Sequence, residues 1–223
     1  MQKPFSLSGR QLKLIAMVSM LIDHIAVSLV ARSSALYTPM RFVGRLAFPL
    51  YCLLLVEGFC HTKDRKRYLL SLLGFALISE IPFNMAVAGK IFDLEAQNVF
   101  FTLSIGLASL MMADEGKKRG KEWCLAVGYL LIPMLALLLR SDYNLGGVAL
   151  ILVISLTRKR DKWRFLGPAL VILSFGHLDS FGALALPLWY LYNGERGRIR
   201  YKYAYYAFYP VHLLVLGLIR MML

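Results

Sequence analysis

The sequence of 223 residues is 58% hydrophobic and only 17% charged, whereas a soluble domain of this size is about half apolar and a quarter charged. Its hydrophobic residues occur in blocks of about 15 to 20, separated by short basic clusters, as is typical of a polytopic α-helical membrane protein. A transmembrane barrel would instead show segments of about ten residues with alternating polarity, and the sequence has no such pattern.

The net charge of +13 is concentrated in loops and does not indicate a nucleic-acid partner. Four basic loops, together with Lys3, Arg10 and Lys13, hold 20 of the 26 lysines and arginines. These basic clusters occur in every second loop between the predicted spans, so the positive-inside rule predicts that they are cytoplasmic. They also offer a docking surface for an anionic cofactor. The loops cover 62–68, 114–122, 157–164 and 194–202.

In chain order, nine transmembrane helices are predicted, with the N-terminus in the cytoplasm and the C-terminus outside. Counts of eight or ten stay open, but the alternation of basic loops supports nine. The first apolar block is too long for a cleavable signal peptide, and no small-residue cleavage site follows it. Pro49 predicts a kink in the second helix. One domain is predicted over 1–223. The predicted helices cover about 12–31, 42–61, 68–88, 98–113, 123–140, 144–157, two short segments within 163–193, and 204–222.

Eight polar or ionisable residues fall inside these predicted spans. A charge there costs roughly 2.5–3.5 kcal/mol, and such residues usually face the bundle interior or a cavity. By contrast, the three cysteines show no disulfide or metal-ligand spacing, so we predict packing roles for them and no metal site. The eight residues are Asp23, His24, Arg45, Glu57, Glu80, Asn84, Asn98 and His212.

Helix geometry places Lys13 and His24 on one stripe of the first helix, because the steps through Met17 and Met20 return to the same face. Lys13 is at the cytoplasmic edge, and His24 is about 18 Å deep. Asp23 lies on a neighbouring stripe. A histidine next to an aspartate, on a face that leads to a basic edge, indicates a general base, and we assign that role to His24.

The same polar residues also admit purely structural roles. Arg45 would neutralise Asp23 or Glu80 and lock helices together. Glu57 and His61 lie near the headgroup level, where an interfacial role is expected. Asn98 is placed to cap its helix. For His212, packing, hydrogen bonding and catalysis are all open.

Five stretches carry a more specific pattern: LKLIAMVSMLIDHIAV (12–27), MRFVGRLAFPLYCLLLVEGFCHTKDRKRYLLSLLGFALISEIPFN (40–84), NVFFTLSIGLASL (98–110), DYNLGGVALILV (142–153) and YYAFYPVHLLVL (205–216). Together they resemble the TraX family over nearly the whole chain, most specifically in the first hundred residues. TraX-type proteins are multi-span membrane proteins whose named member acetylates the N-terminus of a conjugative pilin.

The family is in turn similar to wider transmembrane acyltransferases, the acyltransferase-3 enzymes and the lysosomal heparan glucosaminide acetyltransferases. Those carry a basic residue and a histidine separated by ten residues, a spacing that Lys13 and His24 share. Lysine here replaces the usual arginine, which keeps a cation but loses a bidentate fork. A second pattern of the family matches Arg41, Gly44, Arg45, Phe48, Pro49 and Gly58.

This resemblance implies an acetyl-CoA-dependent N- or O-acetyltransferase in the bacterial cytoplasmic (inner) membrane. It would move an acetyl group from cytoplasmic acetyl-CoA to an amine or hydroxyl of a peptide, glycan or small molecule at or beyond the outer face. We expect His24 and Asp23 to be catalytic, with Asp23 or a nearby acid fixing the tautomer of His24. The expected cofactor-binding residues are Lys13, Arg41, Arg45 and Glu57. The expected substrate-binding or supporting residues are Glu80, Asn98, Asp142, Tyr209 and His212.

Two other classes of protein compete with this interpretation. A small transporter or lipid-handling membrane protein also needs charges near the midplane and helix-breaking prolines. Inverted repeats would favour that class, and the sequence shows none. A non-enzymatic membrane scaffold would have no use for an Asp-His pair above a cytoplasmic lysine. Binding of CoA separates the enzyme from both alternatives.

Overall fold

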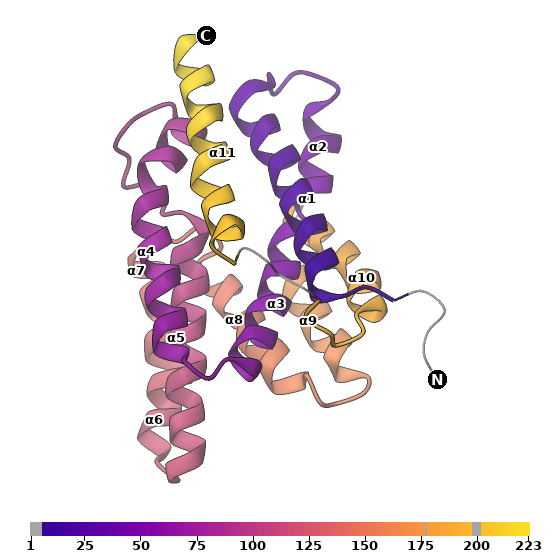
Figure 1. The fold of residues 1–223 in the computed structure, drawn as a ribbon, viewed down its shortest axis with the longest axis vertical. Coiled ribbons are helices and arrows are strands. Elements are labelled where there is room, and N and C mark those ends of the chain that lie inside the picture. The colour runs from indigo at the N-terminus through magenta and orange to yellow at the C-terminus, as the bar shows by residue number, and fades with distance from the viewer. Residues whose placement is uncertain (1–5, 177, 198–201) are drawn as a thin grey trace. The chain divides into compact units, whose positions relative to one another are not determined.

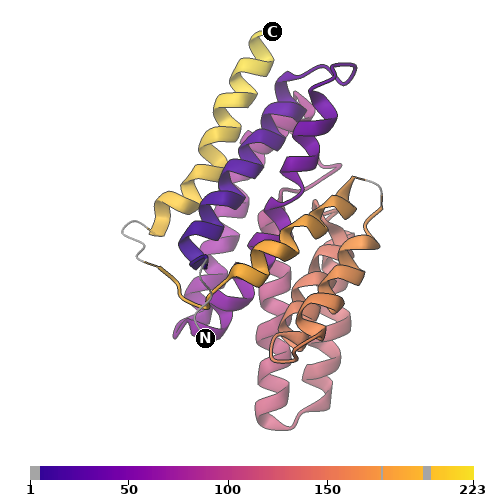
Figure 2. The ribbon, with the colours of Figure 1, turned by 90° about the vertical axis from the view of Figure 1, so that its right-hand side faces the viewer.

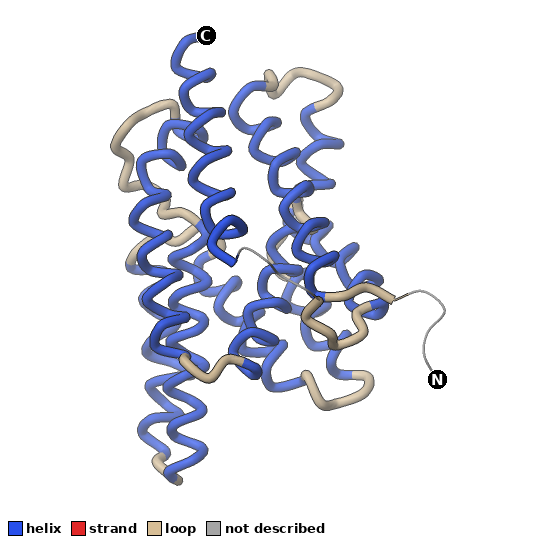
Figure 3. Tube along the Cα trace, in the orientation of Figure 1, coloured by secondary structure: helices blue, strands red, loops and turns tan. Residues whose placement is uncertain are grey.

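The computed structural model describes residues 6–176, 178–197 and 202–223, so Lys3 and part of the basic loop 194–202 lie outside it. Its described residues form helices and no strand, which confirms the all-α prediction (Figure 3). Two π-helical turns, η1 (Asn84–Ala88) and η2 (Val127–Leu131), and a 3-10 helix, η3 (Asp179–Ala185), interrupt or join the α-helices. The α-helices are α1 Gly9–Leu29, α2 Tyr37–Gly44, α3 Ala47–His61, α4 Arg65–Phe83, α5 Val99–Arg119, α6 Glu122–Ala126, α7 Ile132–Leu138, α8 Asn144–Thr157, α9 Trp163–Leu173, α10 Leu186–Leu191 and α11 Lys202–Met222 (Figure 1).

Among the described residues, five helical segments are long and apolar enough to cross a membrane. Three further apolar helices are shorter, between 10 and 17 residues. The chain is therefore a helical membrane protein, but the predicted count of nine spans is not confirmed, and the orientation of the N-terminus stays a prediction. The five segments are Gly9–Leu29, Tyr37–His61, Arg65–Ala88, Val99–Arg119 and Tyr203–Met222; the shorter helices are Glu122–Leu138, Asn144–Thr157 and Trp163–Leu173.

Pro49 breaks the second predicted helix into α2 and α3. A proline has no N–H to donate to the carbonyl four residues earlier, and its ring clashes with that carbonyl. For Pro49 that carbonyl belongs to Arg45, and the helix is interrupted at Arg45 and Leu46. The kink predicted from Pro49 is thus a full break, and it leaves α2 as a separate short helix that carries Arg41 next to α1.

The internal contacts of the chain divide into two compact units, and the division falls inside α3 and α4. The first unit comprises 1–54, 81–92 and 172–223. Its central helix is α1, which packs against α2, α11 and η1; α1 and α11 lie side by side in both views (Figures 1 and 2). The start of α1 is tied down by backbone hydrogen bonds from Gly9 to Glu195 and from Arg10 to Arg196, at 2.7 and 3.0 Å.

The second unit comprises 55–80 and 93–171, with α5 at its centre. Helix α5 packs against α6, η2, α7 and α8. Small residues permit these close contacts: a Cβ on Gly106 would lie 2.3 Å from Ile151, and one on Gly128 would lie 2.7 Å from the backbone of Ala113. The prediction of one domain over 1–223 stays a prediction.

Helix α11 shows how the apolar surface is divided between the protein interior and lipid. Tyr209 and Leu213 are buried against the rest of the first unit. Val211 and Val215, on another face, are 58% and 51% exposed. In water such a surface would be unfavourable, so these side chains fit a helix with one face toward the bundle and another toward acyl chains.

Candidate functional site

Lys13 and His24 lie on the face of α1 that packs against α11. The Lys13 ammonium is 5.1 Å from the centre of the Tyr205 ring and 5.9 Å from that of Tyr206. Three turns further along α1, the His24 ring centre is 5.0 Å from that of His212. The single stripe predicted for Lys13 and His24 is confirmed, and the order of these contacts shows that α1 and α11 run in the same direction.

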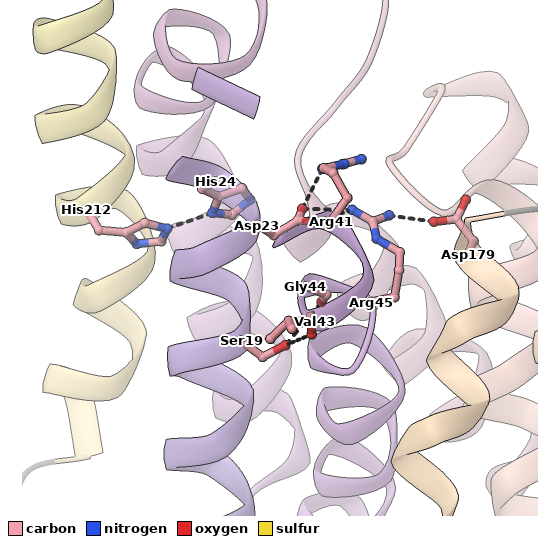
Figure 4. A network of polar contacts seen from close by, with 9 residues as sticks. All are labelled: Ser19, Asp23, His24, Arg41, Val43, Gly44, Arg45, Asp179 and His212. Atoms are coloured by element: carbon pink, nitrogen blue, oxygen red, sulfur yellow. Dashed lines mark hydrogen bonds and ion pairs between the residues drawn. The ribbon is translucent and has the colours of Figure 1, made fainter. Parts of the chain in front are cut away.

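A pair of histidines forms the deeper end of this face. Nδ1 of His24 lies 2.7 Å from Nε2 of His212 (Figure 4). Nδ1 of His212 lies 2.6 Å from the carbonyl oxygen of Phe208. The His212 ring stacks on the rings of His24 and Phe208, with ring centres 5.0 and 4.7 Å away. Tyr209 places its ring edgewise to both histidines at 5.8 Å. Both imidazoles are thus held by hydrogen bonds and by packing.

Asp23 is the centre of a separate ion-pair network. Its carboxylate accepts hydrogen bonds from Arg41 at 2.7 Å and from Arg45 at 2.9 and 2.7 Å (Figure 4). Arg45 also pairs with Asp179 at the start of η3. The Asp23 and Arg45 side chains are only 11% and 10% exposed. Of the two partners expected for Arg45, the structure shows Asp23, and the network ties α1 to α2 and η3.

Gly44 permits the close approach of α2 to α1 that this network needs. A Cβ at Gly44 would lie 2.1 Å from Oδ1 of Asp23, far inside contact distance. One turn earlier on α1, the Ser19 hydroxyl donates to the carbonyl oxygen of Val43. The second predicted stripe, Ser19 and Asp23, therefore faces α2.

The expected contact between Asp23 and the His24 ring is replaced by other contacts in the structure. Adjacent residues on a helix point about 100° apart and do not face the same neighbour. Asp23 consequently faces the arginines of α2, while His24 faces α11. The residue that contacts Nδ1 of His24, and so is placed to fix its tautomer, is His212.

Comparison with known proteins identifies the family. The family model described as TraX protein matches residues 8–220. The chain belongs to the TraX family. The probable fimbrial assembly protein FimC of serogroup H1 from Dichelobacter nodosus is 32% identical over 249 aligned residues, which cover 100% of each chain. No solved structure matches the chain.

In this TraX-family chain, the remaining expected site residues lie in the second unit. Glu57 binds Arg158 at 2.6 and 3.0 Å, with His61 3.5 Å from its carboxylate. The Asn98 amide donates to Glu80 at 2.6 Å, and its side-chain oxygen caps the start of α5. The capping role predicted for Asn98 is therefore confirmed.

Asp142 lies in the loop before α8, where its backbone N–H donates to the carbonyl oxygen of Gln97 at 2.9 Å. The roles assigned to Asp142, Glu57 and Glu80 stay predictions. Their local contacts in this TraX-family chain include backbone hydrogen bonds and ion pairs that stabilise the second unit.

Two members of the site in the first unit, Asp179 and Tyr205, were not predicted from the sequence. Asp179 was not among the expected site residues, yet it begins η3 and pairs with Arg45. Tyr205 was left without a role, although it lies seven residues before His212 and so belongs to the same face of α11. That spacing is the signal that could have linked Tyr205 to His212. For Asp179 the only signal was a carboxylate next to a short apolar segment.

Proposed function

We propose that this TraX-family protein is a membrane-embedded acetyltransferase that uses cytoplasmic acetyl-CoA. The observation that carries the proposal is the contact face between α1 and α11, which has Lys13 at its start and the His24–His212 pair about 16 Å further along. The cation is placed to bind the anionic nucleotide end of acetyl-CoA, and the imidazole is placed to act at its thioester end.

Basic residues at the start of α1 support a site for the anionic nucleotide end of acetyl-CoA. The backbone hydrogen bond between Arg10 and Arg196 brings these two cationic residues to the helix start, one turn from Lys13. Several positive charges near a helix N-terminus attract phosphate groups. The pantetheine arm then lies along the face between α1 and α11 and places the thioester near His24.

His24 acts as the general base in this proposal. An acceptor amine or hydroxyl gives its proton to His24 while its nitrogen or oxygen attacks the thioester carbonyl carbon. The carbon–sulfur bond then breaks, and the CoA thiolate leaves with the proton that His24 holds. The acceptor gains one acetyl group, and CoA is released as the free thiol.

We propose that the acceptor is a protein N-terminus at the outer face of the bacterial cytoplasmic membrane. A relative of this chain is named a probable fimbrial assembly protein, which supports a surface-protein acceptor over a small metabolite or a glycan. The ion-pair network of Asp23, Arg41 and Arg45 next to His24 then stabilises the end of the site from which the acceptor arrives.

The proposal is tested by ligand-induced stabilisation of the purified protein in detergent. Acetyl-CoA at 100 times its Kd should stabilise the folded protein by about 2.7 kcal/mol. Lys13→Met should weaken this effect, while Arg32→Met, which removes a positive charge from the loop after α1, should retain it. Absence of stabilisation in the wild type is the result expected for a transporter, a lipid-handling protein or a scaffold, and it would reject the proposal.

A further inference from the structure

The hydrogen bonds of the histidine pair define which ring nitrogens carry protons. Nδ1 of His212 lies 2.6 Å from the carbonyl oxygen of Phe208. A carbonyl oxygen can only accept, so Nδ1 of His212 must be the N–H donor. A neutral imidazole carries one N–H, which leaves Nε2 of His212 as an acceptor.

That acceptor determines the state of His24. Nε2 of His212 is 2.7 Å from Nδ1 of His24, so the hydrogen of this contact belongs to Nδ1 of His24. The other nitrogen of His24, Nε2, is then unprotonated, and it makes no hydrogen bond with any residue in the described part of the chain. We infer that His212 is a positioning residue, which selects the tautomer of His24 whose Nε2 is the reactive atom.

The neutral state of both rings follows from their surroundings. Both lie between α1 and α11, in helices apolar enough to span a membrane, where an uncompensated charge is costly. Asp23, the nearest carboxylate in sequence, is bound to Arg41 and Arg45. Within the described ranges, neither imidazole has an ion-pair partner.

The same contacts explain how His212 supports the chemistry, and this part of the inference rests on the proposed acetyltransferase function. When Nε2 of His24 takes the acceptor proton, Nδ1–H still donates to His212, and the hydrogen bond strengthens because its donor is now charged. The Phe208 carbonyl cannot take a proton from His212. The proton therefore remains on His24 and returns to the departing thiolate, as the balanced transfer requires.

Nitrogen-15 NMR of the full-length protein, labelled in its histidines, tests the tautomer without any assay of activity. The chain has four histidines, and His61→Asn with His177→Gln leaves only the pair. We expect both rings to be protonated at Nδ1 and bare at Nε2. A protonated Nε2 on His24 in the wild type would overturn the inference.

Two variants of His212 test its role. The side-chain oxygen of His212→Gln can still accept from Nδ1 of His24, whereas His212→Phe keeps an aromatic ring but offers no acceptor. We expect the phenylalanine variant to populate the other tautomer of His24 and to lower kcat about 100-fold at an unchanged KM for acetyl-CoA. The glutamine variant should keep the tautomer and stay within about tenfold of wild type. An unchanged His24 tautomer and kcat in His212→Phe would contradict the inference.

These experiments separate the inference from the proposed function. If the NMR spectra show the expected tautomer but no acetyl transfer occurs in any sample, the acetyltransferase proposal fails and the positioning of His24 by His212 stands. If transfer occurs and Nε2 of His24 is protonated, the positioning role of His212 is rejected and the acetyltransferase proposal is retained. If His212→Phe does not fold, the wild-type spectrum and the His212→Gln variant decide whether His212 selects the tautomer of His24.

Discussion

At the scale of single residues, the buried carboxylate of Asp23 is the most constrained charge of the site. It faces two guanidinium groups, those of Arg41 and Arg45, and is 11% exposed in its ion pairs. Asp179 meets Arg45 as well, but its side chain is 39% exposed. Arg45 therefore pairs with one buried carboxylate, Asp23, and one partly solvated carboxylate, Asp179, and the two can be compared by matched substitutions.

We predict that Asp23→Asn lowers the free energy of unfolding by about 3–5 kcal/mol, because it leaves buried guanidinium charge without its counter-charge. Asp179→Asn should cost about 1 kcal/mol or less, since exposed ion pairs are worth little. Unfolding titrations in mixed detergent micelles measure both values. Equal losses in the two variants would show that Asp23 is not the carboxylate that balances the arginines.

The sequence could predict His24 and the stripe it shares with Lys13, because helical periodicity fixes which residues share a face. It could not predict His212 as the partner of His24, since periodicity does not say which helix packs against that face. The two histidines are 188 residues apart. The expected contact between Asp23 and His24 is wrong, because the side chains of adjacent residues on a helix point in different directions.

At the scale of elements, the contact between α1 and α2 depends on Gly44, whose lack of a side chain lets Asp23 reach the arginines. Helix boundaries in this region follow from Pro49, which separates α2 from α3. The sequence predicted most helices to within a few residues, as the apolar blocks are long. It did not predict that α2 is a separate helix, because a kinked helix and a broken one share the same pattern.

We predict that Gly44→Ala destabilises the protein by about 1–3 kcal/mol through overpacking and lowers acetyl transfer by displacing α2 from Asp23. Gly74→Ala is the matched control: this glycine is inside α4, and an added Cβ meets no atom of the described residues within 4 Å. The control should be neutral or more stable by up to about 1 kcal/mol. Thermal melts of the two variants measure the difference, and similar melts would contradict the tight α1–α2 contact.

At the scale of the whole molecule, the proposed reaction requires that the start of α1 meets the cytoplasm, where acetyl-CoA is available. The basic loops predict this orientation through the positive-inside rule. Composition alone was enough to predict a helical membrane protein. It was not enough for the number of spans, because helices of 10 to 17 residues such as α8 and α9 are at or below the length that crosses a bilayer.

Cysteine labelling tests this orientation. Cys60 is exposed near the basic loop 62–68. Leu94, 82% exposed, lies between the predicted spans 68–88 and 98–113, and a cytoplasmic N-terminus places this loop outside. In spheroplasts that carry the Leu94→Cys variant without the native cysteines, we predict that a membrane-impermeant maleimide labels the introduced cysteine. Cys60, retained alone, should be labelled only in inside-out vesicles. The reverse pattern would place the start of α1 outside and contradict a cytoplasmic donor.

In the proposed reaction His24 removes the proton that permits acetyl transfer, and a transfer assay with a His24 variant tests this role. Purified protein is incubated with acetyl-labelled acetyl-CoA and an acceptor peptide with a free N-terminus, and label on the peptide is counted. We predict transfer by the wild type and by His61→Ala, whose side chain is 66% exposed. His24→Ala should lower transfer by a factor of 100 or more, within the range of about 10²–10⁴ for general-base catalysis. Equal transfer by His24→Ala and the wild type would show that His24 is not the general base.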